Sequence, residues 1–463
     1  MDTAMRGVDP DRLLYSLMFP AIIMPMTGWM FSVSLPIIRD DLGIAPDVAA
    51  WIATAFTLTF MMMMPVYGRI SEGLGKRRLL LWGIAIFVVG ALLATFSTNL
   101  AMLIIGRAVQ GFGVAGLLPL SLALITEVFP PEKRGKAMGL FSTSGPFTGV
   151  VGPIAAGFIV AAWGWRASFV PALIVALAGL VVVGLLIPSS IKKVNFSFLS
   201  HFDWLGVGLL AATLTGLLFY FSSRPITGVE PLRDWRLGGL TLLLLVAFVR
   251  HERRHPDPFI RLDILNNKSL LVGSACASLR MLGMSGGLGF VMPLYLHDIV
   301  GLPPEHIGFY LMANPGAMII FVLIGGRLSD RFGSRVLTMT GFVIFATMML
   351  VFSQLPQAVP AWLLILCLFG FGIGAGLMLA ALHRAALNDV PEADLGTASG
   401  LYSMLRFLGS AAGSAAGGIL LQFYMDRSGT GLLASYQNVF LWYLGFALLG
   451  FLAATQLPKS KFA

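Results

Sequence analysis

The sequence predicts an all-α membrane protein with about fourteen transmembrane helices. Of its 463 residues, 57% are hydrophobic and only 11% are charged, and the mean hydropathy is +0.85. A soluble chain carries roughly 25% charged residues, so this chain has too little polar surface to cover a water-soluble globule. Apolar stretches of about 20 residues, the length that crosses a hydrocarbon core, recur from one end of the chain to the other.

Each apolar stretch is predicted as one helix, and short polar connections with glycine or proline separate the stretches. The first eight lie near 13–36, 48–68, 79–98, 101–126, 136–160, 166–188, 204–222 and 236–250. Six more follow near 269–296, 306–326, 336–354, 361–383, 397–424 and 437–456. The stretch at 236–250 is the shortest, which leaves thirteen helices as the alternative count.

The positive charges are divided unequally between the two sides of the predicted membrane. Of the 31 Lys and Arg, 22 lie at the termini or in loops on the same side, six lie in the opposite loops, and three lie inside helices. The positive-inside rule therefore predicts a multi-pass protein of the plasma (inner) membrane with both termini in the cytoplasm. Despite the net charge of +9, no single basic face is present, so nucleic acid is not an expected partner.

The sequence repeats itself at a spacing of about 260 residues. Gly-Arg-Ile-Ser-Glu-Gly-Leu-Gly, at 68–75, returns as Gly-Arg-Leu-Ser-Asp-Arg-Phe-Gly, at 326–333. Further pairs occur in the same order: Pro36 with Pro293, Asp40 with Asp298, Gly43 with Gly301, Pro46 with Pro304, Gly111 with Gly372, and Gly135 with Gly396.

The repeat maps helices 1–6 onto helices 9–14 in the same orientation. It predicts two six-helix bundles related by a pseudo-two-fold axis along the membrane normal, as in carriers whose halves rock around a central site. We expect the first bundle at 1–190 and the second at 263–463. Two inserted helices with their cytoplasmic linkers occupy 191–262.

Several motifs resemble those of the major facilitator superfamily. The doubled glycine element resembles its cytoplasmic signature, and Arg107-Ala-Val-Gln-Gly111 resembles its fourth-helix arginine motif. Asp203-Trp-Leu-Gly206 and the segment from Arg406 to Gly413 resemble the fourteen-helix drug–proton antiporter branch. The fifth helix resembles the antiporter motif of drug exporters through Gly145, Gly149, Gly152, Pro153 and Gly157. The resemblance implies the major facilitator fold and alternating access.

The same resemblance implies a cytoplasmic gate made by the two signature copies. Its residues are Gly68, Glu72 and Gly75 in the first copy, and Gly326, Asp330, Arg331 and Gly333 in the second. The first copy departs from the family pattern, because Glu72 replaces the usual Asp and Gly73 the usual Arg. The first-helix acidic residue common in the branch falls at Thr27, so the sequence offers no carboxylate for proton handling there.

Three arginines, Arg107, Arg280 and Arg406, lie within predicted helices, and no Asp or Glu lies at comparable depth. A charge at the bilayer centre costs about 2.5–3.5 kcal/mol on insertion scales, so such residues usually face a cavity or a partner. They could recognise an anionic or carbonyl-bearing group, or they could bond backbone carbonyls and hold helices together.

The aromatic residues offer a second set of candidates for the substrate site. Most Phe, Trp and Met side chains are expected to face lipid or neighbouring helices. Trp29, Phe56 and Tyr295 are the candidates for lining an adaptable pocket.

Three functions fit these observations. The first is a secondary transporter that exports amphipathic small molecules or drugs in exchange for protons. The second is a carrier for an organic anion or a lipid-like acid that uses the buried arginines, because His297 and Asp298 at an outer helix end are a poor substitute for a central carboxylate. The third is a membrane sensor that binds a ligand without transporting it.

An enzyme is not predicted, because no set of histidines and carboxylates clusters within the bilayer. Cys276 and Cys367 lie inside apolar stretches, which gives neither a disulfide framework nor metal-ligand spacing. We expect no metal and no cofactor. The expected partners are membrane lipid, a small-molecule substrate and protons, and the chain is expected to be a monomer.

Overall fold

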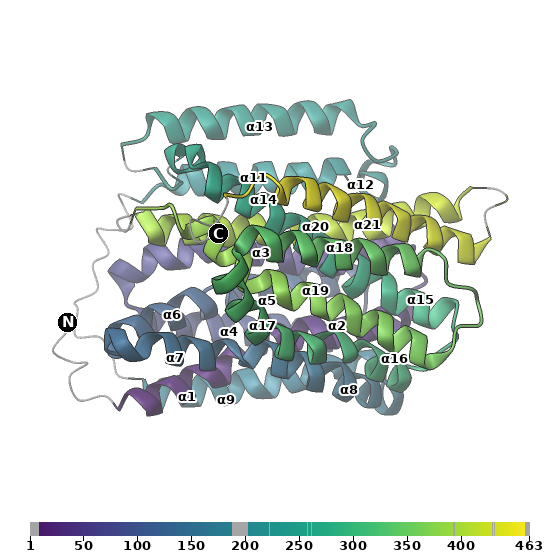
Figure 1. Cartoon of the computed structure of the whole chain (residues 1–463), viewed down its shortest axis with the longest axis horizontal. Coiled ribbons are helices and arrows are strands. Elements are labelled where there is room, and N and C mark those ends of the chain that lie inside the picture. The colour runs from purple at the N-terminus through teal and green to yellow at the C-terminus, as the bar shows by residue number, and fades with distance from the viewer. Residues whose placement is uncertain are drawn as a thin grey trace.

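The computed structural model is a bundle of long helices that run side by side (Figure 1). It describes residues 9–187, 202–221, 223–256, 258–260, 262–391, 394–427, 429 and 431–458. No strand occurs within these ranges, so the all-α class is confirmed.

The first six spans contain nine α-helices. They are α1 (Pro10–Ala21), α2 (Ile23–Leu42), α3 (Pro46–Leu74), α4 (Lys76–Thr95), α5 (Leu100–Val114), α6 (Leu117–Val128), α7 (Pro131–Ser142), α8 (Ser144–Trp163) and α9 (Val170–Leu186). The 3-10 helix η2 (Trp165–Phe169) precedes α9. Most spans extend beyond the predicted bounds, because their polar first and last turns carry no apolar signal.

The last six spans contain eight α-helices and one π-helix. They are α14 (Lys268–Leu282), the π-helix η4 (Gly283–Val291), α15 (Met292–Asp298), α16 (Pro304–Leu311), α17 (Ala313–Phe332), α18 (Ser334–Phe352), α19 (Ala361–Leu387), α20 (Leu395–Met425) and α21 (Leu432–Ala454). A short 3-10 helix, η3 (Leu262–Asn266), leads into α14.

Four spans predicted as continuous helices are interrupted, and each interruption lies three or four residues before a proline. The helices break at Ile22, at 115–116, at Thr143 and at Met312, and the prolines are Pro25, Pro119, Pro146 and Pro315. A proline has no N–H for the carbonyl four residues earlier, and its ring crowds that carbonyl. The residues at these four places keep right-handed helical φ and ψ, so each span still runs through as one helical stretch, as predicted.

The two halves pair their helices in the same way. In the first half α4 packs on α5 and α9, α3 on α5, and α2 on α8. In the second half α18 packs on α19 and α21, α17 on α19, and α14 on α20. These pairs correspond under the sequence repeat, as expected of two bundles related by a pseudo-two-fold axis.

Two seams join the bundles. At one seam α3 packs on α20, and at the other α8 packs on α16 and α17. We call the end of the molecule where α1 begins and α21 ends the terminal end, and the opposite end the distal end. Gly75 and Gly333 close the two signature copies at the terminal end with φ of 84° and 82°, a region that favours glycine.

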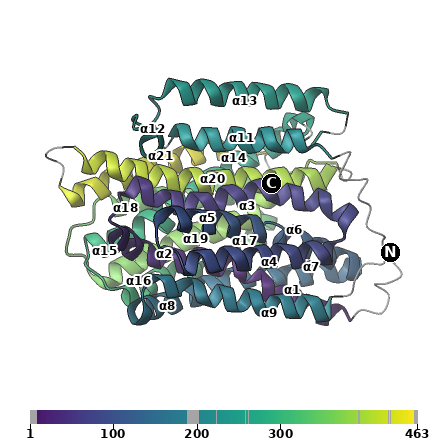
Figure 2. The same ribbon diagram turned by 180° about the vertical axis from the view of Figure 1, so that it is seen from behind.

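The inserted pair consists of α11 (Trp204–Phe221) and α13 (Trp235–Arg254), with α12 (Arg224–Thr227) between them. The two helices pack on each other at one edge of the molecule (Figures 1 and 2), and α11 also contacts α3 and α20. Near the distal end Arg224 forms an ion pair with Asp426, just beyond α20. That carboxylate holds the pKa of Arg224 above its ordinary value.

Thirteen helical stretches in the described part of the chain are long and apolar enough to span a membrane. The fourteenth predicted span, α13, has 20 residues but carries Arg236 near its start and four charged residues at its end. Its charges therefore lie where a spanning helix would meet the membrane surfaces. The division at residues 190 and 262 stays a prediction.

Candidate functional site

A row of side chains crosses the seam between α3 and α20. Arg107, from α5, lies 4.5 Å from the ring centroid of Phe56, which stacks on Phe60 with the ring centroids 6.2 Å apart. Phe60 meets Phe407 of α20 edge to face at 4.8 Å, and Arg406 lies 4.7 Å from the Phe407 centroid. The row thus joins one arginine from each bundle through three aromatic rings.

Arg107 is 2% exposed, and polar and aromatic groups of its own bundle contact its guanidinium. Its Nη1 donates to Gln110 Oε1 at 3.0 Å, and its Nε donates to the Ile52 carbonyl at 3.3 Å. A second ring, that of Phe31, lies 4.7 Å from the guanidinium carbon. Hydrogen bonds and cation–π contacts of this kind offset part of the cost of burying the charge.

Arg280 and Arg406 in the second bundle are less well satisfied. Arg280 is 2% exposed, and its Nη atoms lie 3.0 Å from Met284 Sδ and 3.5 Å from Met281 Sδ. A thioether sulfur is a weak acceptor. The buried Nε atoms of both arginines have no hydrogen-bond partner. Among the described residues no carboxylate forms an ion pair with either of them.

Two more polar side chains lie beside these arginines. His383 of α19 packs edge to face on Tyr402 of α20 at 4.7 Å, and both arginines are near enough to His383 to act on it electrostatically. The second bundle therefore collects positive charge and unused N–H donors at membrane depth. Such a group can accept a carboxylate, a sulfonate or a carbonyl oxygen.

The remaining predicted pocket residues lie elsewhere. The Thr27 hydroxyl donates to the Ile23 carbonyl of its own helix. Trp29 packs against α8, because a Cβ at Gly149 would lie 2.9 Å from its Nε1. Tyr295 is fully buried between Tyr436 and Phe440 near the distal end. Phe56 is thus the predicted aromatic residue that joins the arginine row.

The glycines of the fifth-helix motif differ in their surroundings. A Cβ at Gly145 would meet nothing within 4 Å, whereas one at Gly149 would lie 2.7 Å from Pro315 of α17. Gly152 faces Trp29, because a Cβ added at Gly152 would lie 3.3 Å from the Trp29 Cβ. The Pro153 carbonyl lies directly against Gly308 of α16. This motif therefore forms the first-bundle side of one seam.

The distal end of each seam is closed by the same contact, repeated by the pseudo-two-fold axis. A Cβ at Gly157 would lie 2.7 Å from the Pro304 carbonyl oxygen, and a Cβ at Gly418 would lie 2.6 Å from the Pro46 carbonyl oxygen. Pro46 and Pro304 are partners in the sequence repeat, and Gly157 and Gly418 occupy corresponding places in α8 and α20. Only glycine lets the backbones approach this closely.

An ion pair between the bundles adds to the distal closure. Arg39, at the end of α2, donates to both carboxylate oxygens of Asp298, at the end of α15, at 2.6 and 2.7 Å. The Tyr436 hydroxyl and His297 Nδ1 also lie 2.5 and 2.9 Å from this carboxylate. The sequence repeat had paired Asp40 with Asp298 but gave no signal that Arg39 would bridge the bundles.

A further contact between the bundles uses the π-helix. Ser32 of α2 donates to the Gly289 carbonyl at 2.8 Å. That carbonyl cannot receive the usual helical bond from residue 293, because Pro293 has no N–H. The proline and the glycine-rich sequence around it thus make a carbonyl available to the opposite bundle.

The terminal end of the interface is not closed in the same way. A Cβ at Gly68, Gly326 or Gly400 would meet nothing within 4 Å. Asp330 pairs with Arg384 of its own bundle, and Arg331 lies over the Phe332 ring at 5.3 Å. The Glu72 side chain lies outside the described residues. The described contacts therefore hold the distal end shut, and none of them joins Gly68, Gly326 or Asp330 to the opposite bundle.

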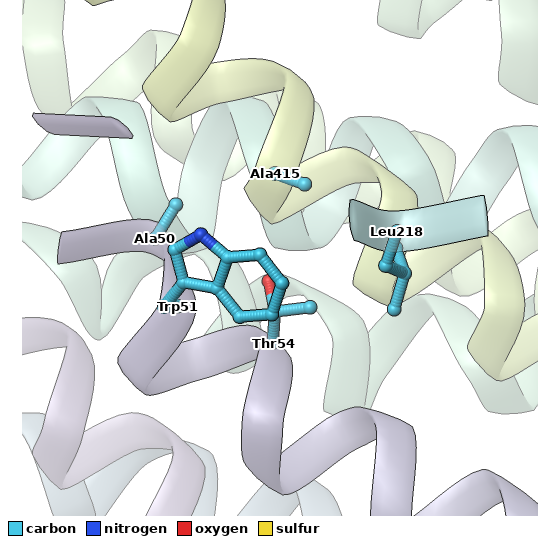
Figure 3. A pocket seen from close by; sticks show the side chains of 5 residues that line it. All are labelled: Ala50, Trp51, Thr54, Leu218 and Ala415. Carbon is cyan, nitrogen blue, oxygen red and sulfur yellow. The ribbon is translucent and has the colours of Figure 1, made fainter. Parts of the chain in front are cut away.

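A small recess lies beside the arginine row, where α11 covers the seam between α3 and α20. Figure 3 shows the Trp51 ring and Thr54 on one side, with Leu218 and Ala415 facing them. Its lining is apolar apart from the Trp51 indole N–H and the Thr54 hydroxyl, and that hydroxyl has no hydrogen-bond partner. The inserted pair therefore shields this seam from the surrounding lipid.

The family model described as Major Facilitator Superfamily matches residues 17–414, and in a second match residues 274–461. A probable actinorhodin transporter of Streptomyces coelicolor is 31% identical over 415 residues, which cover 85% of this chain and 69% of that protein. The multidrug resistance protein B homolog of Mycobacterium tuberculosis is 27% identical, with 90% and 79% covered. The riboflavin transporter RibZ of Clostridioides difficile is 27% identical, with 84% and 83% covered.

Solved structures share the fold at low sequence identity. A POT family transporter crystallised with 5-aminolevulinic acid has a TM-score of 0.72 at 14% identity, with 97% of this chain and 98% of that chain covered. A mutant of the nucleoside transporter NupG has a TM-score of 0.65 at 13% identity, with 96% and 99% covered.

Proposed function

Because the chain belongs to the Major Facilitator Superfamily, we propose that this transporter exports amphipathic small molecules in exchange for protons by alternating access. The observation that carries the proposal is the row from Arg107 to Arg406. It offers flat apolar rings to an aromatic substrate and a cation from each bundle to its polar groups. A substrate bound there would contact both halves, as alternating access requires. Relatives named as multidrug and actinorhodin transporters support this substrate class.

We further propose that the terminal end faces the cytoplasm of the plasma (inner) membrane, on the charge distribution of the loops. A transporter whose distal end is closed by the contacts described above is then oriented to accept substrate from the cytoplasm. Opening that end would have to break the ion pair between Arg39 and Asp298. The Asp298 carboxylate is stabilised in its ionised form by Arg39, His297 and Tyr436.

One observation favours a second candidate function, the transport of organic anions. Arg280 and Arg406 have unpartnered buried N–H groups, and no carboxylate in the described spans balances them. An anionic substrate would supply the missing acceptors. In this case the substrate charge itself contributes to binding.

Proteoliposomes with an imposed proton gradient separate the two candidates. Internal pH is recorded while tetraphenylphosphonium, a lipophilic cation, or 1-anilinonaphthalene-8-sulfonate, an aromatic anion, is added. The variants are Phe407→Leu and Arg406→Gln. Phe96→Leu, at an exposed ring, and Arg427→Gln, at an arginine over the surface ring of Phe423, are the matched controls.

Drug–proton exchange predicts that the cation dissipates the gradient and that Phe407→Leu slows this, while both controls leave it unchanged. Anion transport predicts that only the sulfonate dissipates the gradient and that Arg406→Gln abolishes the effect. If neither compound changes internal pH although both cross the membrane with the protein, the proton coupling is wrong. If Phe407→Leu and Arg406→Gln behave as their controls do, the arginine row is not the substrate site.

A further inference from the structure

Two histidines and a carboxylate meet at the terminal end of the inserted pair. Asp203 directly precedes α11, and His251 and His255 lie four residues apart at the end of α13. His251 Nε2 lies 2.6 Å from Asp203 Oδ1. One ligand atom from each of the three residues lies within 4.8 Å of the others, and the two imidazole rings are 5.2 Å apart.

Asp203 is held in place by backbone groups from two directions. Its Oδ1 accepts from the Gly206 N–H at 2.8 Å, and its Oδ2 accepts from the Phe259 N–H at 3.3 Å. The residue is 5% exposed. Burial raises its pKa, but the hydrogen bonds from His251, Gly206 and Phe259 outweigh that effect and hold the pKa below the usual value. The two backbone N–H groups therefore fix the orientation of the carboxylate beside His251.

A second carboxylate is buried beside the first with one oxygen unused. Glu252 is 4% exposed, and its Oε2 accepts from the Ile260 N–H at 3.0 Å. Its Oε1 has no hydrogen-bond partner. A Cβ at Gly206 would lie 2.5 Å from Glu252 Oε1 and closer still to Asp203 Oδ2, so both oxygens crowd the same space. Two carboxylates this close repel each other when both are ionised, and either a proton on Glu252 or a nearby cation relieves that repulsion.

We propose that Asp203, His251 and His255 bind a divalent transition-metal ion, with Glu252 as the neighbouring carboxylate that completes its surroundings. Histidines four residues apart on one helix face, together with carboxylate oxygen, are ligands that suit Zn²⁺. Bonds of about 2.0–2.2 Å place neighbouring tetrahedral ligands roughly 3.3 Å apart. The three ligand atoms lie within 4.8 Å of one another, and His251 Nε2 is 2.6 Å from Asp203 Oδ1, so the observed spacing spans that value.

The ion would fasten the inserted pair to the second bundle. Asp203 and Glu252 already bind the backbone of Phe259 and Ile260, which lead through η3 into α14. A metal ion would join the start of α11 and the end of α13 to the same segment. The site lies at the membrane surface, away from the arginine row, so its metal would be structural or regulatory and not part of the substrate site.

The test measures Zn²⁺ binding to protein purified without a polyhistidine tag and stripped with a chelator. Zn²⁺ is titrated against a chromogenic competitor, and thermal unfolding is followed with and without the ion. The variants are His251→Gln and His255→Gln, which leave the helix-capping Asp203 intact. His306→Gln, at an exposed histidine near the distal end, is the control.

We expect one ion per chain, an affinity at least tenfold lower in each cluster variant, and an unchanged affinity in the control. Zn²⁺ should raise the unfolding temperature of the wild type and of His306→Gln, but not that of His255→Gln. Without metal all three should unfold at similar temperatures, which shows that the variants fold. If the wild type binds Zn²⁺ no better than His255→Gln does, the proposal is wrong and His251 and Asp203 form only a hydrogen-bonded clip.

Discussion

The distal closure rests on two glycine–proline contacts, and adding one methyl group to either contact should open it. In Gly157→Ala the new Cβ would lie 2.7 Å from the Pro304 carbonyl oxygen, and in Gly418→Ala it would lie 2.6 Å from that of Pro46. Ordinary van der Waals contact begins at 3.4 Å. Both neighbours are backbone atoms at helix starts, so relief requires the paired helices to move apart.

Overpacking of this kind costs about 1–3 kcal/mol. The cost applies only while the distal end is closed, because the new methyl group meets no such neighbour once the seams separate. Since about 1.4 kcal/mol is a factor of ten in an equilibrium constant, each substitution should shift the population toward the distal-open state by roughly 5- to 150-fold. The two substitutions should act alike, because the repeat places them equivalently.

The shift can be measured as a distance between two spin labels at the distal end. Thr98, between α4 and α5, and Gln357, between α18 and α19, are exposed and lie in corresponding loops of the two bundles. The labels are attached to cysteines at these positions after Cys276 and Cys367, both buried, have been replaced by alanine. We expect a longer distance to gain population in Gly157→Ala and in Gly418→Ala.

The chain offers matched controls for this experiment. In Gly239→Ala of α13 and Gly445→Ala of α21 the new methyl group meets nothing within 4 Å, so the label distance should stay that of the parent protein. Unchanged label distances in both Gly157→Ala and Gly418→Ala would refute the steric reasoning. Equal shifts of the label distance in Gly157→Ala, Gly418→Ala and the controls would refute the steric reasoning as well, because the shift would then not depend on the contact at the seam.

Three further predictions follow from single contacts. Asp298→Asn should lower the unfolding temperature and lengthen the distal label distance, because Arg39 then keeps only its pair with the exposed Asp40. The cost should stay below the value of about 3–5 kcal/mol for breaking a fully buried pair. Adding Arg39→Gln should restore part of the loss, and an additive double variant would show that the pair is not coupled. Asp330→Asn should change unfolding by less than about 1 kcal/mol in a denaturant titration, since its exposed pair with Arg384 lies within one bundle. The pKa of Asp203 is below its usual value, so its stabilising effect is present above the ordinary carboxyl pKa of about 3.9 and is lost as the pH falls below it. The difference in unfolding temperature between wild type and Asp203→Asn should therefore shrink below about pH 4. A difference that grows as the pH falls from about 5 to 3 would contradict this assignment.

Much of the fold could be predicted from hydropathy and the repeat, because a membrane admits few ways to satisfy a polar backbone. Apolar length determined the spans, and the repeated signature indicated which helices correspond. The local interruptions within four spans were not predicted, although each has a proline downstream. Neighbouring groups can compensate for a proline in a membrane helix, so the residue alone does not show whether the helix bends, breaks or continues.

Single residues of the candidate site could be predicted from the sequence, but not which of them meet in space. Arg107 and Arg406 were marked by their depth, and Phe56 by its type, but Phe60 and Phe407 carry no feature that separates them from other aromatic residues. Their meeting depends on which faces α3 and α20 turn toward each other. That rotation is decided by contacts such as Gly418 against Pro46, between segments more than 350 residues apart in the sequence.

The same contacts constrain how the molecule can move. The two seams are equivalent under the pseudo-two-fold axis, and each bundle is packed continuously within itself, so neither seam can open at its distal end without turning one whole bundle against the other. A methyl group added in one seam, by Gly157→Ala or Gly418→Ala, should therefore also separate the helices of the other seam. It follows that the double variant Gly157→Ala with Gly418→Ala should populate the same label distance as either single variant, only more fully. A new and longer distance in the double variant would mean that the bundles bend instead of rocking as rigid bodies.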